Sequence, residues 1–72
     1  MNDQNKTLQA VQFTGSAIRV EFDGDKEKYK NFVFACYKEP RIPIDTPDGK
    51  TIIVGNNDLK LLRKRGYEIE VS

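Results

Sequence analysis

The sequence contains no histidine, no tryptophan and a single cysteine, Cys36. Histidine is the side chain that most often moves protons near neutral pH, so its absence removes the usual general acid and base. Cys36 has no histidine to activate it and lies in an apolar stretch, where burial raises the pKa of a thiol and makes it inert. We therefore expect a structural cysteine, no catalytic residue and no enzyme activity.

The same shortage argues against metal and cofactor sites. Zinc sites rely on clusters of cysteine and histidine, which this chain cannot form. Asp23, Asp25 and Glu27 lie in one short loop, but calcium takes roughly six to eight oxygen ligands. Residues 55–57 precede an expected helix, yet they lack the second glycine and the lysine of a phosphate-binding loop. We expect no metal and no cofactor.

Neither sign of charge dominates, because 12 Lys and Arg residues face 11 Asp and Glu residues, for a net charge of +1. Strong nonspecific nucleic-acid binders usually carry a basic excess. One cysteine allows no internal disulfide, which a secreted domain this small would usually need. The N-terminus shows no charged-then-apolar signal segment, and no apolar run approaches the length of a membrane span. We expect a soluble, cytoplasmic protein that does not enter a membrane.

The 72 residues suffice for one domain with one hydrophobic core. Residues 1–6 are polar, and we expect them to be flexible, with residues 7–72 forming a single small α+β domain. A core of this size leaves little room for a deep pocket. Function should therefore depend on the surface.

A first hairpin is expected near the N-terminus. Residues 18–22 alternate apolar and polar side chains, which is the period-two pattern of a half-buried strand. A two-residue turn at 15–16 would place Phe13 opposite Ile18 and would put Val11 and Phe13 on the buried face of the preceding strand.

A second hairpin is expected around residues 46–50, whose sequence Thr-Pro-Asp-Gly-Lys indicates a type I turn with Gly49 in the left-handed conformation. That turn would place Ile44 opposite Ile52. The first strand of this hairpin, Arg41–Asp45, has a proline at its centre that cannot donate to a ladder, so we expect an edge strand.

A short helix and a last strand complete the chain. Asn56 or Asn57 can cap the helix, and Gly66 can end it. Residues 67–71 then alternate apolar side chains with glutamates, as a half-buried strand does.

Residues 28–37 fit two structures. A helix capped by Asp25 would form one apolar stripe and leave Phe34 exposed; the stripe consists of Tyr29, Phe32, Val33, Cys36 and Tyr37. A strand suits the aromatic and β-branched residues at 32–34 better, and we favour it. The fold is then a β-rich α+β domain of two hairpins, a C-terminal helix and a final strand, arranged as a curved sheet or partly open barrel. With a helix there, the element order β-β-α-β-β-α-β resembles the β-grasp of ubiquitin-like domains.

The aromatic segment is the first candidate binding surface. If it is a strand, both of its faces are apolar and one helix can cover only one, which leaves a face for a partner or a second copy. The expected protein-binding residues are Tyr29, Phe34, Tyr37 and Arg41. We expect a non-enzymatic binding module that acts through protein–protein interaction, of a size that suits a small regulator or inhibitor. A homodimer is a further form that such a surface allows.

The second candidate surface is the basic end of the short helix, made of Lys60, Arg63, Lys64 and Arg65. Cations in the last turn of a helix complement its dipole, which is the simpler interpretation. Presented together they could also contact phosphates, so nucleic-acid binding through this helix is the alternative function.

Overall fold

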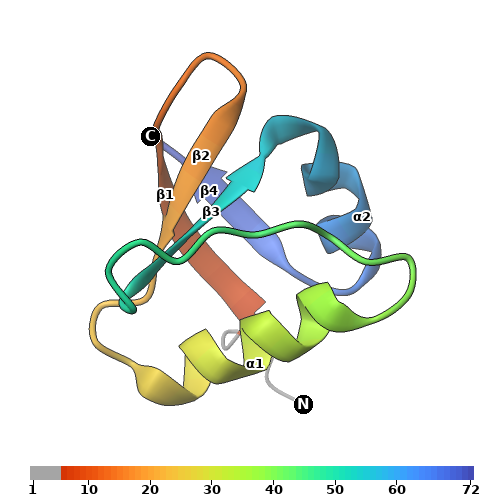
Figure 1. Cartoon of the computed structure of the whole chain (residues 1–72), viewed down its shortest axis with the longest axis horizontal. Helices are drawn as coiled ribbons and strands as arrows, with labels where there is room; N and C mark the ends of the chain where they lie inside the picture. Colours follow the sequence, from red (N-terminus) through yellow and green to blue (C-terminus); the bar gives the residue numbers. More distant parts are fainter. Residues whose placement is uncertain (1–5) are drawn as a thin grey trace.

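Four strands form one open sheet in the computed structural model, which describes residues 6–72 (Figure 1). The strands are β1 (Thr7–Gln12), β2 (Ala17–Glu21), β3 (Thr51–Gly55) and β4 (Glu68–Val71), in the spatial order β3-β2-β1-β4. Neighbouring strands are antiparallel except β1 and β4, which are parallel. The edges β3 and β4 do not pair with each other, so the sheet is open. The predicted α+β class is confirmed, whereas the predicted flexible N-terminus lies outside the described residues except for Lys6.

Two helices and a short 3-10 turn accompany the sheet: α1 (Lys26–Tyr37), η2 (Asn56–Asp58) and α2 (Leu59–Lys64). Both helices pack on the same face, because Phe32 of α1 and Leu62 of α2 are fully buried in one cluster with the sheet. The strands contribute alternate residues to that cluster, namely Leu8, Ala10, Ile18, Val20, Ile52, Val54 and Ile69. We call this the inner face of the sheet. Within the described residues, no helix combines the length and apolar character needed to cross a bilayer.

The prediction of a strand over residues 28–37 is wrong, because this segment is the helix α1. The Asp25 side chain accepts a hydrogen bond from the Lys28 N–H at 3.1 Å and caps the helix, as the helical alternative required. The helix buries Phe32 and Cys36 completely, while Phe34 stays 60% exposed. Covering the inner face of the sheet therefore outweighs the local β-propensity of residues 32–34.

The predicted register of the first hairpin is wrong by one residue. Gln12, not Phe13, lies opposite Ile18. The turn has three residues instead of two, because the Phe13 N–H already bonds to the Ala17 carbonyl at 2.9 Å. A one-residue shift exchanges the two faces of a strand. The inner-face residues of β1 are therefore Leu8 and Ala10, and Phe13 is 53% exposed.

The second hairpin keeps its turn but loses most of its first strand. Gly49 has the predicted left-handed conformation, with φ of +69°. Of the segment 41–45, only Asp45 pairs with β3, opposite Ile53, which shifts the predicted register by two residues. Pro43 has no N–H, and the Ile42 N–H bonds instead to the Cys36 carbonyl at 2.9 Å, so the ladder cannot extend. An even shift keeps the faces, and Ile42 remains buried.

The end of α2 follows the prediction, whereas its start does not. Gly66 has φ of +98°, its N–H bonds to the Arg63 carbonyl, and the Tyr67 N–H bonds to the Leu62 carbonyl, both at 3.0 Å. This is a Schellman motif, and it directs Tyr67 into the core. There the centroids of the Tyr67 and Phe32 rings lie 5.2 Å apart. The expected asparagine cap is wrong, because neither η2 nor α2 has a side-chain cap hydrogen bond.

Candidate protein-docking site

One side of α1 carries three aromatic or apolar residues that are only partly buried. Tyr29, Val33 and Tyr37 follow each other at four-residue intervals, which places them on one ridge of the helix. Tyr29 and Val33 are half-buried, and Tyr37 is 52% exposed. Residues 41–50 cross the molecule beside this ridge (Figure 1). The helix and this segment form two walls.

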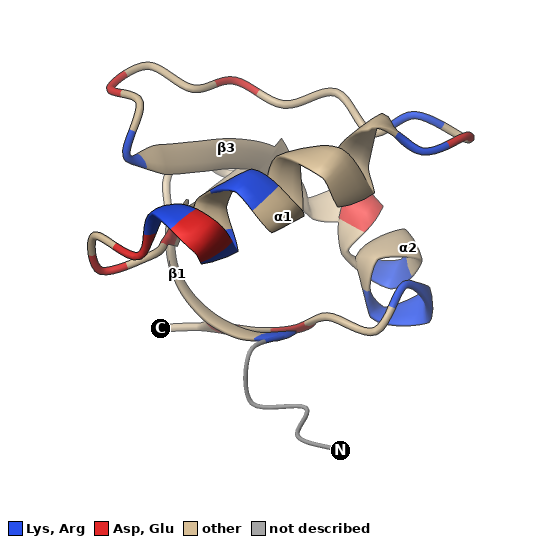
Figure 2. Ribbon diagram, turned by 90° about the horizontal axis from the view of Figure 1, so that it is seen from below, with Lys and Arg blue, Asp and Glu red and all other residues tan. Residues whose placement is uncertain are grey.

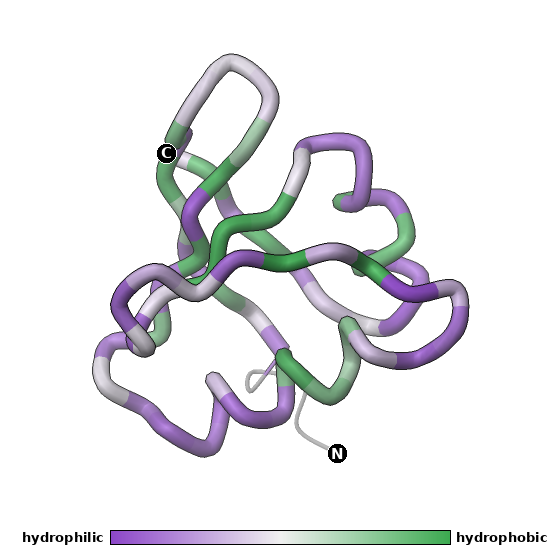
Figure 3. Tube along the Cα trace, viewed as in Figure 1, coloured by the Kyte–Doolittle hydropathy of each residue, from purple (hydrophilic) through white to green (hydrophobic). Residues whose placement is uncertain are grey.

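Two hollows lie between these walls. The larger, of about 760 Å³, has Phe22, Tyr29 and Val33 in its lining, and the smaller, of about 410 Å³, lies beside Tyr37. Because both hollows follow the ridge formed by Tyr29, Val33 and Tyr37, we refer to them together as the α1 groove. Figure 3 shows hydrophobic residues in the second half of α1 and in parts of the segment that follows it.

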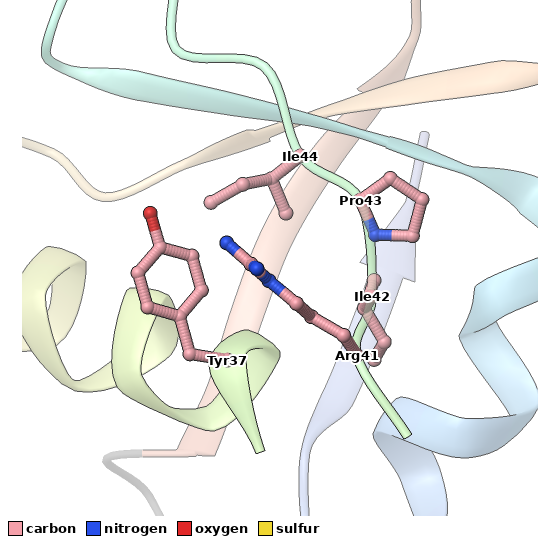
Figure 4. Close-up of a pocket in the computed structure, with 5 residues that line it drawn as sticks. All are labelled: Tyr37, Arg41, Ile42, Pro43 and Ile44. Atoms are coloured by element: carbon pink, nitrogen blue, oxygen red, sulfur yellow. The ribbon is translucent and has the colours of Figure 1, made fainter. Parts of the chain in front are cut away.

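The smaller hollow is organised by a cation and an aromatic ring. The Arg41 guanidinium lies over the Tyr37 ring, with 4.7 Å between its central carbon and the ring centroid. Figure 4 shows this guanidinium between the Tyr37 ring and the Ile44 side chain. Within residues 6–72, Arg41 donates no hydrogen bond. Its guanidinium N–H groups therefore have no acceptor among these residues and could donate to a carboxylate or a carbonyl.

The larger hollow has an apolar floor and a charged rim. The rings of Phe22 and Tyr29 meet edge to face at 5.4 Å between centroids, which fixes the floor. The rim carries three lysines and two aspartates, namely Lys26, Lys30, Lys50, Asp23 and Asp25. The Asp25 carboxylate is already engaged as the cap of α1. Figure 2 shows that the charges of α1 gather in its first half and that its second half is uncharged.

The α1 groove is more basic than the protein as a whole. Across both hollows, four cationic side chains stand against two carboxylates, whereas the whole chain has a net charge of only +1. The walls thus combine apolar anchors with a local positive potential, which favours an acidic ligand.

Three of the four predicted protein-binding residues line the α1 groove, and one does not. Tyr37 and Arg41 line the smaller hollow, and Tyr29 lines the larger. Phe34 points to another side of α1, where it lines a third hollow of about 250 Å³ with Lys38 and Arg65 among its neighbours. Val33 belongs to the site although the prediction did not name it. Its place four residues from both tyrosines is a helical signal, which the strand interpretation obscured.

The basic residues at the end of α2 are not equivalent. Lys60, Arg63 and Lys64 are exposed, but Arg65 is half-buried. Its guanidinium donates hydrogen bonds to three carbonyl oxygens beyond α2, those of Ala35, Lys38 (3.2 Å) and Pro40. The last turn of α1 has no basic residue of its own. Arg65 therefore supplies the cation at the C-terminal end of α1, which sequence spacing could not reveal.

Cys36 is fully buried, and burial raises the pKa of its thiol to about 11. The thiol is thus protonated at neutral pH, and the predicted burial of Cys36 is confirmed. Burial also raises the pKa of Tyr67. Between Lys6 and Ser72, no group of three His, Cys, Asp or Glu side chains is placed to hold a metal ion.

Comparison of the chain with family models, with curated proteins and with solved structures gives no match. No relative therefore assigns a role to any residue.

Proposed function

We propose that this protein is a non-enzymatic binding module whose α1 groove takes a short segment of a partner protein. The observation that carries the proposal is the ridge of Tyr29, Val33 and Tyr37, which faces a second wall without being covered by it. Solvent-exposed aromatic and apolar side chains in a concave surface are typical of protein contact sites. An arginine stacked on a tyrosine, as Arg41 is on Tyr37, combines two residue types that often dominate binding energy.

The groove favours an acidic segment with apolar anchors. The excess of cations along its walls attracts carboxylates, and the apolar floor accepts aliphatic or aromatic side chains. Tyr29 and Tyr37 are eight residues apart, so the ridge is about 12 Å long at 1.5 Å per helical residue. A partner segment of roughly four extended residues spans that length at about 3.3 Å each. The ligand is thus a short linear segment.

A protein of this kind acts by sequestering a segment of its partner, as a small regulator or inhibitor does. The cytoplasm is the expected setting, because a free, buried cysteine such as Cys36 is ordinary in a reducing compartment.

Nucleic-acid binding through α2 is the weaker alternative. Only Lys60, Arg63 and Lys64 remain exposed there, since Arg65 is held by three carbonyl oxygens. Each phosphate contact adds to the salt dependence of binding, so three cations on one turn predict a shallow salt slope.

The test is selection from a random peptide library displayed on phage, followed by titration of the selected peptides. We expect enriched peptides to combine acidic residues with aromatic or aliphatic ones. Tyr37→Ala should weaken their binding at least tenfold, because it removes one wall of the smaller hollow. Phe34→Ala is the matched control, since it removes an equally exposed ring from the same helix outside the groove.

The proposal would be overturned if the selected peptides bind the Tyr37→Ala and wild-type proteins equally. It would also fail if a labelled single-stranded oligonucleotide binds more tightly than any peptide and loses its affinity in the Arg63→Ala/Lys64→Ala variant. That result would establish the alternative function.

A further inference from the structure

The two edge strands of the sheet differ in whether their outward main-chain groups are hydrogen-bonded. At β3, both main-chain groups of Ile53 are paired with Asp45, at 3.0 and 2.8 Å. The Thr51 N–H is bonded to the Asp48 carboxylate at 2.9 Å. Edge strands that are covered in this way cannot accept another strand. The segment 41–45, expected from the sequence to be an edge strand, instead covers the β3 edge through Asp45.

At β4 the edge is not covered. The strand pairs only with β1, in a parallel register that sets Leu8 beside Ile69 and Ala10 beside Val71. The Ser72 N–H bonds to the Ala10 carbonyl at 2.9 Å. In a parallel ladder alternate residues point their main-chain groups at the neighbour, so those of Glu68, Glu70 and Ser72 face β1. The N–H and C=O groups of Ile69 and Val71 therefore point away from the sheet.

No hydrogen bond within residues 6–72 uses these outward groups of Ile69 and Val71. We call them the open β4 edge. Unpaired main-chain groups in a row are a template for an added strand, which is one of the recurring modes of peptide recognition.

The side chains of β4 determine which charges an added strand should carry. Glu68 and Glu70 are exposed on the outer face, and the Gln9 side-chain amide donates to Glu70 at 2.8 Å. On the other face Ile69 is buried, but Val71 is 41% exposed. A strand laid along this edge would place alternate side chains beside the two carboxylates and the others beside Val71. Opposite charges across a strand pair stabilise it, so basic residues fit the carboxylate side.

A second copy of the chain fits this edge poorly. If two β4 strands pair antiparallel with Ile69 opposite Val71, the two Glu70 side chains lie opposite each other. Shifting the pair so that Ile69 meets Ile69 sets Glu68 opposite Glu70. Like charges in direct opposition destabilise a strand pair. A third register, with Val71 opposite Val71, sets Glu70 opposite Ser72, but it pairs only residues 70–72 among those described. The charges of β4 therefore favour a different chain as the occupant.

We propose that the open β4 edge accepts an extended segment of a partner protein in which basic residues alternate with apolar ones. This surface is separate from the α1 groove and takes a ligand of opposite charge. The proposal does not depend on the function assigned to that groove.

Amide hydrogen exchange followed by NMR tests the proposal with two synthetic peptides, Lys-Val-Lys-Val-Lys-Val and Glu-Val-Glu-Val-Glu-Val. In the free protein the amides of Ile69 and Val71 should exchange much faster than that of Glu70. The Lys-Val peptide should slow both at least tenfold, and the Glu-Val peptide should not. The double variant Glu68→Lys/Glu70→Lys should reverse this preference.

Val71→Pro removes one outward donor without touching the ladder to β1, and proline is tolerated where an edge N–H faces solvent. It should abolish the protection of Ile69 by the Lys-Val peptide, whereas Val71→Ala, which keeps the N–H, should retain most of it. Tyr37→Ala should leave the protection of Ile69 and Val71 by the Lys-Val peptide unchanged, because Tyr37 lines the α1 groove and not the open β4 edge. Equal protection by both peptides, or slow exchange of Ile69 and Val71 in the free protein, would overturn the proposal. Protection that grows with protein concentration would instead establish a second copy as the occupant.

Discussion

The guanidinium of Arg65 donates a hydrogen bond to the carbonyl oxygen of Ala35, which lies 30 residues earlier in the chain. Its bonds to Lys38 and Pro40 extend the contact into the segment that leads to Arg41. One side chain that directly follows α2 thus closes the end of α1 and supports a wall of the α1 groove. Arg65 therefore has a structural role, whereas the other basic residues of this cluster are exposed on the surface.

Arg65→Ala should therefore lower the free energy of unfolding by roughly 1–3 kcal/mol, since several hydrogen bonds to a charged group are lost together. Arg65→Lys should recover only part of it, because a lysine cannot bridge three carbonyls with a planar fork. Urea unfolding followed by circular dichroism measures both. Arg63→Ala is the control and should stay within about 0.5 kcal/mol of wild type. Equal effects at the two positions would contradict this role of Arg65.

Truncation of Phe32 should lower the free energy of unfolding strongly, whereas truncation of Phe34 should barely change it. Phe32 is fully buried against Phe22 and Tyr67, so Phe32→Ala should cost roughly 3–5 kcal/mol. A domain of this size has about 4–10 kcal/mol of stability, so this variant should lose a large share of it. Phe34→Ala should be within about 0.5 kcal/mol of wild type in thermal unfolding. Similar losses in the two variants would argue for the strand that the helix α1 replaced.

The Cys36 thiol should make stability fall at alkaline pH. Its folded pKa of about 11 lies above the ordinary value of 9.0, so the folded state favours the neutral thiol. That contribution is fully present below pH 9 and is lost as the pH rises through about 11. Unfolding measured at pH 8 and at pH 10.5 should show a smaller difference for Cys36→Ala than for wild type. An identical pH dependence in both proteins would exclude Cys36 as the cause.

The Asp48 carboxyl should make stability fall at acidic pH. Hydrogen bonds from the main-chain N–H groups of Lys50 and Thr51 lower the pKa of its carboxyl to about 2. The ionised form holds the turn at 46–50, so its contribution is present above pH 4 and is lost as the pH falls toward 2. A carboxyl-carbon NMR titration should give a midpoint near 2. Asp48→Asn should remove this transition, and a midpoint near 4 in wild type would show that the turn does not bind the carboxylate.

The sequence predicted the features that depend on neighbouring residues. The left-handed Gly49 and Gly66 follow from turn and cap chemistry over a few positions, and the buried face of β2 follows from simple alternation. Residues 28–37 carried both a helical and a strand pattern. The sheet decides between them, because Phe32 and Cys36 have to cover it together, and that requirement is not visible in a local window.

The candidate site was predicted in part for the same reason. Tyr29, Tyr37 and Arg41 were singled out by residue type, and the fold brings Tyr37 and Arg41 into one hollow while Tyr29 lines the other. The role of Arg65 and the open β4 edge were missed, because each depends on which elements become neighbours in space. The one-residue error in β1 arose because a three-residue turn replaced the expected two-residue turn, a difference that Gly15-Ser16 does not specify.

The parallel pairing of β1 with β4 sets when the domain can form. Gln9 and Glu70 are hydrogen-bonded although 61 residues separate them. Contacts between such distant positions slow folding, because the chain must close a long loop before the contact stabilises it. During synthesis, β1 is made early but has no neighbour on its β4 side until almost the whole domain has left the ribosome. The domain should therefore complete its sheet only after translation of β4, and chains that stop before Glu68 should remain unfolded and exposed to proteases.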